Sequence, residues 1–323
     1  MRRLILTTDA AGAGWLRQAK RADRIDVLGQ RLVCDRPPTP GETDSFFGPG
    51  QGDTPHWLDW QARGSDQPGL IQTCRAFDAI ELWIDPVANA QLVLLQLLDF
   101  LRPQDDIIGK LVLRQADSRI GERGPEEFAT LSPPPVPVEA RHLDTARRAW
   151  NAFRQPTPEA WFDLRTRDLA ALPALSRAVL DLLAELPAVG SALGATEAML
   201  LGLITPGGPP PFYAPSYRRI IERGVFDTWE IGRMLDRLAH GPTPAVLGLE
   251  GGPFDLAIHD DAERFRRYKA SRLSLSALGH ALLAGQEDFA AHNPIQRWWG
   301  GTELTNDRLW RWDASRQTLV APA

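Results

Sequence analysis

Short apolar runs separated by helical patterns dominate the first part of the chain. Runs that predict strands lie at residues 3–8, 79–84 and 107–113, and patterns that predict helices lie at residues 10–20 and 87–101. The strand–helix–strand order from residue 79 to residue 113 is typical of a βαβ unit, which implies a parallel sheet with a right-handed crossover. The sequence therefore predicts a Rossmann-like parallel-sheet α/β domain over residues 1–137.

The middle of the chain is helical in pattern. A polar connector over residues 114–137 ends in SPPPVPV, a run that favours a stiff, extended backbone. An amphipathic pattern follows at residues 139–153, and further helical patterns lie at residues 157–164 and 176–186. We interpret residues 138–190 as a helical linker.

The last part of the chain mixes helices with two short strands. Helical patterns lie at residues 198–204, 217–223, 228–239 and 277–284, and strand patterns lie at residues 245–249 and 272–276. The order helix, helix, helix, strand, strand, helix is that of a winged helix. Residues 191–323 are therefore expected to form a winged-helix-like domain, with a tryptophan-rich tail over residues 292–313.

Composition narrows the protein class. The chain has 323 residues, a formal net charge of −5 and a sequence pI of about 5.7, which is not the global signature of a nucleic-acid binder. Cys34 and Cys74 lie far apart without C-x-x-C spacing, which argues against a zinc site and fits a reducing compartment. We find no long apolar run or signal-peptide core, so we expect no membrane contact and a cytoplasmic location. Abundant arginine, alanine and proline indicate a GC-rich bacterial genome.

The common catalytic motifs are missing from the sequence. There is no G-x-S-x-G, H-E-x-x-H or P-loop, and the glycines at 12 and 14 do not complete G-x-G-x-x-G. This removes the best-marked hydrolase and nucleotide-binding classes and leaves the cofactor unknown.

Two aspartates follow predicted strands. Asp9 follows the first strand and Asp85 follows the strand at residues 79–84. Since ligands bind at the carboxyl ends of strands in open α/β sheets, the two acids are expected to face one crevice and to suit a metal or a hydroxyl-bearing ligand. The alternative is that each acid caps the helix that follows it. No metal is assigned.

Two further groups of residues are candidates for function. His292 has the chemistry of a general base contributed across the domain interface, or it is a structural residue. Between the last two strands, Tyr268 stands among five cations, Arg264, Arg266, Arg267, Lys269 and Arg272. They are expected either to clamp phosphates of DNA as a wing or to form a solvated loop paired with nearby acids. Residues 190–285 hold ten bases and ten acids, so the module is neutral.

Several segments resemble a known bacterial family. LTTDAAGAGWLRQA and WIDPVANAQLVLLQLLDFL, with Trp83, Asp85 and Gln91, resemble segments of the family designated "domain of unknown function eighteen thirty-five". ARRAWNAF, LSLSALGHALLAG, HNPIQRWWGG and WRWD resemble further blocks, so the resemblance covers most of the chain. It implies an α/β domain with a winged-helix-like C-terminal region and makes Gln91 a candidate ligand-binding residue. The family's G-D-S is replaced here by Thr8, Asp9 and Ala10.

These observations lead to two functional expectations. The first is a cytosolic bacterial regulator or adaptor whose α/β domain senses a small molecule and whose winged helix contacts a protein or DNA. The alternative is an enzyme that acts on a small polar or phosphorylated substrate, with Asp9 and Asp85 in the crevice.

Overall fold

The computed structural model describes residues 1–39, 69–210 and 217–322. The chain forms two compact units. Unit 1 comprises Met1–Leu32, Arg36–Gln155 and Asp163–Val179, and unit 2 comprises Val33–Asp35, Pro156–Phe162 and Leu180–Ala323. The stretch interpreted as a helical linker is divided between the two units, and the three-part domain division stays a prediction.

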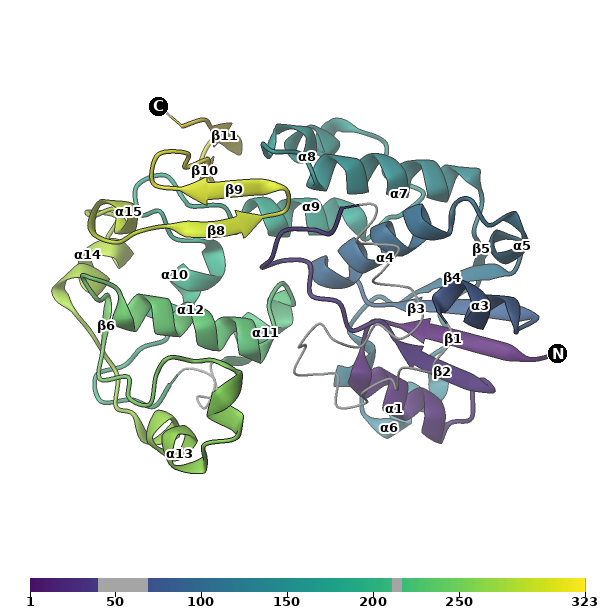
Figure 1. Ribbon diagram of the computed structural model, residues 1–323, viewed down its shortest axis with the longest axis horizontal. Helices are drawn as coiled ribbons and strands as arrows, with labels where there is room; N and C mark the ends of the chain where they lie inside the picture. The colour runs from purple at the N-terminus through teal and green to yellow at the C-terminus, as the bar shows by residue number, and fades with distance from the viewer. Residues whose placement is uncertain (40–68, 211–216, 323) are drawn as a thin grey trace. The chain divides into compact units, whose positions relative to one another are not determined.

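Unit 1 is built on a mixed, mostly parallel sheet (Figure 1). Its strands are β1 (Arg3–Thr7), β2 (Arg24–Val27), β3 (Ala79–Ile84), β4 (Leu111–Gln115) and β5 (Val136–Pro137). The strand order is β2-β1-β3-β4-β5; the first four strands are mutually parallel and β5 is antiparallel to β4. The predicted Rossmann-like parallel sheet is confirmed. The proline-rich run adds an antiparallel edge strand, a position where proline is tolerated.

Helices flank this sheet, and those over residues 159–183 are divided between the two units. In chain order they are α1 (Ala10–Gln18), α3 (Leu70–Arg75), α4 (Ala88–Leu101), α5 (Asp105–Ile108), η1 (Ile120–Glu122), α6 (Pro125–Thr130), α7 (Ala140–Phe153), α8 (Glu159–Asp163), η2 (Leu164–Thr166) and α9 (Leu175–Leu183). Among the described residues, no helix combines the length and the apolar character that crossing a membrane requires.

One predicted strand began too early. Residues 107–113 were expected to be a strand, but Ile107 and Ile108 belong to α5 and β4 starts at Leu111. Asp105 and Asp106 occupy the first turn of α5, where acidic side chains favour a helix. Ile107 is buried, but it belongs to the helix and not to the sheet.

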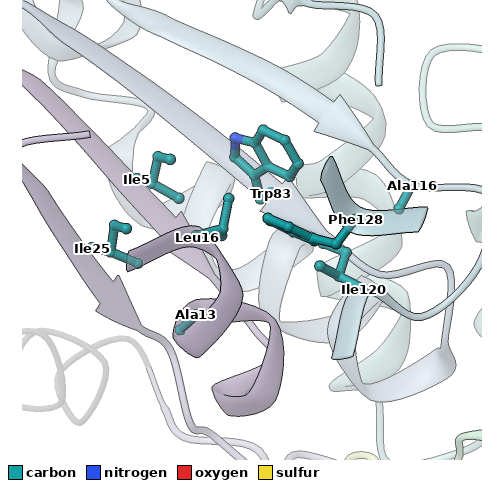
Figure 2. Packing of buried hydrophobic residues seen from close by; sticks show 8 residues of the cluster. All are labelled: Ile5, Ala13, Leu16, Ile25, Trp83, Ala116, Ile120 and Phe128. Carbon is teal, nitrogen blue, oxygen red and sulfur yellow. The ribbon is translucent and has the colours of Figure 1, made fainter. Parts of the chain in front are cut away.

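The alternation of side chains along β3 separates the two faces of the sheet. Ile80, Leu82 and Ile84 are fully buried on the face covered by α4. Glu81 and Trp83 lie on the opposite face. There Trp83 joins a cluster from the sheet, α1, η1 and α6, which contains Ile5, Ala13, Leu16, Ile25, Ala116, Ile120 and Phe128 (Figure 2). The first residue of η1 is thus held by apolar packing against α1.

Unit 2 contains helices and three small antiparallel strand pairs. The helices are α10 (Ala195–Gly202), α11 (Arg218–Arg223), α12 (Thr228–His240), η5 (Leu256–His259), α13 (Ala262–Ala270), α14 (Ala277–Leu283) and α15 (Phe289–His292). The pairs are β6 (Val246–Leu247) with β7 (Ser274–Leu275), β8 (Gln296–Trp299) with β9 (Thr302–Thr305), and β10 (Arg311–Asp313) with β11 (Thr318–Val320). The predicted pairing of residues 245–249 with residues 272–276 is confirmed.

The predicted wing is a helix. Most of the cationic segment was expected to be a loop, but residues 262–270 form α13. Asp261 caps this helix, since its carboxylate accepts a hydrogen bond from the Arg264 N–H at 2.9 Å. Glu263 in the first turn and basic residues in the last turn complement the helix dipole. The charge pattern is therefore that of a capped helix.

The tryptophan-rich tail packs within unit 2. The Trp299 indole donates a hydrogen bond to the Leu182 carbonyl at 2.8 Å. The Trp312 main chain exchanges hydrogen bonds with Pro187 and Val189, and its ring meets Phe162 edge-on. These contacts hold the tail against the end of α9 and the segment that follows it.

Two buried glutamates tie the helices of unit 2 together. Glu185 is 5% exposed; it accepts hydrogen bonds from the Thr196 N–H at 3.0 Å and hydroxyl at 2.7 Å, and pairs with Arg223 at 2.7 Å. Glu197 is 6% exposed and pairs with Arg237 of α12 at 3.2 Å and with Arg297 of β8 at 3.1 Å.

Two arginines stabilise the charged form of Glu197. Burial alone would raise the pKa of Glu197, but the charges of Arg297 and Arg237 hold it below its ordinary value. The Glu197 carboxylate also accepts a hydrogen bond from the Gly194 N–H at 2.9 Å. The residue is therefore a charged, fully partnered anchor.

Glu197→Gln is expected to destabilise unit 2 by about 3 kcal/mol, because it leaves two arginines facing a buried neutral amide. Amide hydrogen exchange of α10 and α12 measures this loss in unit 2 alone. The matched control is Glu303→Gln, which breaks an exposed pair with Arg308 and should cost less than about 1 kcal/mol. Equal effects of the two variants would contradict the anchoring role.

Candidate ligand site at the carboxyl ends of β1 and β3

The order of the strands creates a switch point in the sheet of unit 1. β1 lies between β2 and β3, so the connections that leave β1 and β2 run to opposite sides. Ligands of open α/β sheets bind outside the carboxyl ends of the strands at such a point. Asp9 lies just beyond the end of β1, and Asp85 directly follows β3.

Asp9 joins two elements through its carboxylate. Oδ1 accepts a hydrogen bond from the Ala11 N–H at 2.9 Å, which makes Asp9 the N-cap of α1. Oδ2 accepts a hydrogen bond from the Gly121 N–H of η1 at 2.7 Å. Asp9 is therefore a helix cap, as one alternative held, and it also binds a segment more than a hundred residues away.

Asp85 does not cap a helix. α4 begins at Ala88, with Val87 as its N-cap and no capping side chain, so the interpretation of Asp85 as a cap was wrong. The Asp85 carboxyl is 2% exposed, accepts a hydrogen bond from the Ile120 N–H at 3.0 Å and is hydrogen-bonded to the Asp9 side chain. The structure thus brings Asp9 and Asp85, the acid pair, into direct contact.

The surroundings of the acid pair favour its protonated form. Burial raises the pKa of Asp85 to about 7, and the neighbouring charge of Asp9 adds to the rise. The Ile120 N–H and the charge of Arg119 oppose it. Two carboxyl groups in contact avoid repulsion when one of them is protonated, as in other paired-carboxyl sites.

Glycine at position 121 lets η1 reach the acid pair. A Cβ atom on Gly121 would overlap Asp9 Oδ2 and the Ala11 side chain. A Cβ atom on Gly12 of α1 would come within 2.8 Å of Ile120. The close approach of α1 and η1 therefore depends on both glycines.

Two amide side chains lie next to the main chain at the end of β3. Gln91 donates hydrogen bonds to the Asp85 carbonyl at 2.7 Å and to Gln115 Oε1 at 3.3 Å. Gln115 in turn donates to the Ile84 carbonyl at 2.8 Å. Gln91, which the family resemblance pointed to, is therefore adjacent to the acid pair.

Four residues of this site were missed by sequence reasoning. Thr8 and Gln115 are polar residues at strand ends. The rule that ligands bind at strand ends would have pointed to them, but it was used only for the aspartates. Ile120 and Gly121 act through their main chain, which leaves no local trace in the sequence.

His292 lies in the other unit. It is the last residue of α15, and its imidazole pairs with the exposed Glu287 across 2.9 Å. Its contribution to the site of unit 1 stays a prediction.

The cations of α13 are largely compensated within unit 2. Arg264 donates a hydrogen bond to the Gly251 carbonyl at 2.7 Å and pairs with Asp255 at 3.0 Å. Arg266 pairs with Glu263 at 2.6 Å, and Glu263 also feels the charge of Arg267. These contacts agree with the expectation that the cations pair with nearby acids; the partners are Asp255 and Glu263.

Lys269 and Arg272 make local contacts. The Lys269 ammonium lies 4.5 Å from the centre of the Phe265 ring. The Arg272 guanidinium donates to the Ala270 and Ser271 carbonyls, each at 3.2 Å. Both side chains therefore follow the helix and its end.

Within the described ranges, no three or more His, Cys, Asp or Glu side chains gather in a way that could hold a metal ion. No family model matches the chain, and no curated protein matches it. The resemblance to the "domain of unknown function eighteen thirty-five" family therefore stays a prediction, and the chemistry of the acid pair is the basis for assigning a function.

The raised pKa of Asp85 predicts that stability falls with rising pH. The unfolded chain loses this proton near the ordinary value of 3.8, whereas the folded chain keeps it up to about pH 7. The stabilisation is therefore complete at low pH and is lost as pH rises through about 7, and the shift corresponds to a few kcal/mol at about 1.4 kcal/mol per pH unit.

Asp85→Asn is expected to remove the loss of stability that accompanies rising pH. The introduced amide keeps an oxygen for the Ile120 N–H and offers an N–H to Asp9, so it imitates the protonated acid. Urea unfolding should show that the variant and the natural chain are similar in stability near pH 4, that the advantage of the variant grows from there to about pH 7, and that it is largest at pH 8. Asp105→Asn, an exposed acid of the same unit, is the control. An unchanged pH dependence in Asp85→Asn would show that Asp85 does not hold the proton.

Proposed function

We propose that the chain is a cytosolic bacterial ligand-responsive adaptor. In this proposal unit 1 binds a small polar molecule at the acid pair, and unit 2 is a winged-helix-like module that contacts a partner. The observation that carries the proposal is the hydrogen bond between Asp9 and Asp85 at the switch point of the sheet. Burying two carboxyl groups costs free energy of folding. Their position at the edge of the sheet where ligands bind gives a reason for their presence, namely that they recognise a ligand.

The order of elements in unit 2 supports the winged-helix assignment. α10, α11 and α12 precede the β6–β7 pair, and α14 follows it. The three helices share an apolar core that contains Leu200, Ile220, Ile231 and Met234. Three helices, two paired strands and a final helix belong to this module, and in this chain η5 and α13 stand between the two strands, where a winged helix has its wing.

The partner of unit 2 is better matched by a protein than by DNA. DNA binding draws its affinity from cations that replace counterions on phosphates. Arg264 and Arg266 are already engaged by Asp255 and Glu263, and ten acids balance ten bases over residues 190–285. A neutral surface with paired charges suits protein contacts.

An enzyme is the second candidate, and one observation favours it. The pKa of Asp85, raised to about 7 by burial and by Asp9, is suited to proton transfer at neutral pH. Asp85 would exchange the proton with a small polar or phosphorylated substrate, and Asp9 would orient it. Such a substrate would enter at the same switch point.

Ligand binding is tested by a thermal-shift screen of metabolites, nucleotides and metal salts, because a ligand of the folded state raises the melting temperature. At least one compound should raise the melting temperature of the natural chain, and Asp9→Ala should abolish that shift. Asp9→Ala also removes an N-cap, which costs about 1 kcal/mol.

Asp261→Ala is the matched control for this screen. It removes the N-cap of α13 in unit 2, where Asp261 makes the same kind of hydrogen bond, and should leave the ligand shift intact. A shift that survives in Asp9→Ala would place the ligand elsewhere.

A mobility-shift assay tests the assignment of the partner. We expect no retardation of genomic DNA fragments at physiological ionic strength, and no difference between the natural chain and Arg266→Ala/Arg267→Ala. Arg147→Ala/Arg148→Ala removes a comparable exposed pair from α7 and serves as the control. Retardation that only the α13 variant loses would contradict the protein assignment and make unit 2 a DNA-binding module.

A further inference from the structure

Two polar atoms on residues that adjoin Asp9 in the chain or bond the Asp85 main chain have no hydrogen-bond partner among the described residues. They are Thr8 Oγ1, on the residue before Asp9, and Gln91 Oε1, on a side chain that is 1% exposed. Buried polar atoms without partners are unusual because their lost hydration is not replaced. The two atoms belong to residues that contact or adjoin the two acids from different elements.

The orientation of the Gln91 amide is set by its neighbours. Its Nε2 donates to two oxygens, the Asp85 carbonyl and Gln115 Oε1. A flipped amide would place Gln91 Oε1 against those oxygens. The unpartnered atom is therefore an acceptor, whereas the Thr8 hydroxyl can both donate and accept.

We propose that the ligand at the acid pair is a polyhydroxyl compound bearing a vicinal diol, recognised by Asp9, Thr8 and Gln91. This inference rests on the proposed ligand site and names its chemical class. One hydroxyl group donates to the Asp9 carboxylate and accepts from the Thr8 hydroxyl, and the adjacent hydroxyl donates to Gln91 Oε1. Adjacent hydroxyl groups supply these donors and acceptors from one small molecule.

A cation fits the same atoms less well. The main-chain N–H groups of Ala11, Ile120 and Gly121 already point at the acid oxygens. The N-terminus of α1 and the charge of Arg119 add positive potential at the site. The hydrogen bond between the two acids also requires a proton on one of them, which a cation would have to displace.

Thr8→Val tests the inference, because valine keeps the shape of threonine and removes only the unpartnered hydroxyl. The melting temperature of the full chain is measured with myo-inositol, ribose, 2-deoxyribose, putrescine and magnesium chloride. Ribose or myo-inositol should raise it, and 2-deoxyribose should raise it less. The shift should disappear in Thr8→Val and persist in Thr8→Ser. Without ligand, Thr8→Val should melt no lower than the natural chain, since no protein hydrogen bond is lost.

Thr130→Val, which removes an exposed hydroxyl in the same unit, is the control and should keep the full shift. A diol shift retained in Thr8→Val overturns the inference. A shift caused only by putrescine or magnesium and lost in Asp9→Ala overturns the diol but leaves the ligand site of the proposed function standing. No shift with any compound, in the natural chain or in Asp9→Ala, counts against both.

Discussion

The hydrogen bond between Asp9 and Asp85 is the interaction on which the site of unit 1 depends. It exists because β1 and β3 are parallel neighbours, so that their carboxyl ends meet at one edge of the sheet. It needs a proton on one of the two acids, since two ionised carboxylates in contact would repel each other. It also needs η1, whose main-chain donors approach closely enough only because position 121 is glycine.

Buried acids serve different purposes in the two units. In unit 2, Glu185 and Glu197 are held by three arginines and by main-chain donors; burial raises the pKa of Glu185, whereas the arginines keep the pKa of Glu197 below its ordinary value. In unit 1 the acid pair accepts hydrogen bonds from main-chain donors, and burial raises the pKa of Asp85. A structural role is best served by complete pairing. The proposed function assigns the acid pair of unit 1 a role in ligand binding instead.

The sequence predicted what depends on local pattern. The βαβ order, the pairing of residues 245–249 with residues 272–276 and the place of both aspartates at strand ends all came from short-range signals. The contact of η1 with the acid pair was not predictable, since it joins segments distant in the chain through main-chain atoms. The helix at 262–270 was missed because its dense charges were interpreted as a solvated loop, although Asp261 and Glu263 form a typical helix start.

The hydroxyl of Thr8 connects the sequence to the chemistry of the site. Compared with the G-D-S pattern of the family it resembles, this chain has Ala10 where the serine would be and Thr8 where the glycine would be. Ala10 is exposed at the first position of α1, whereas the Thr8 hydroxyl is buried and unpartnered. Since the Thr8 hydroxyl has no partner among the described residues, the proposed ligand would supply one.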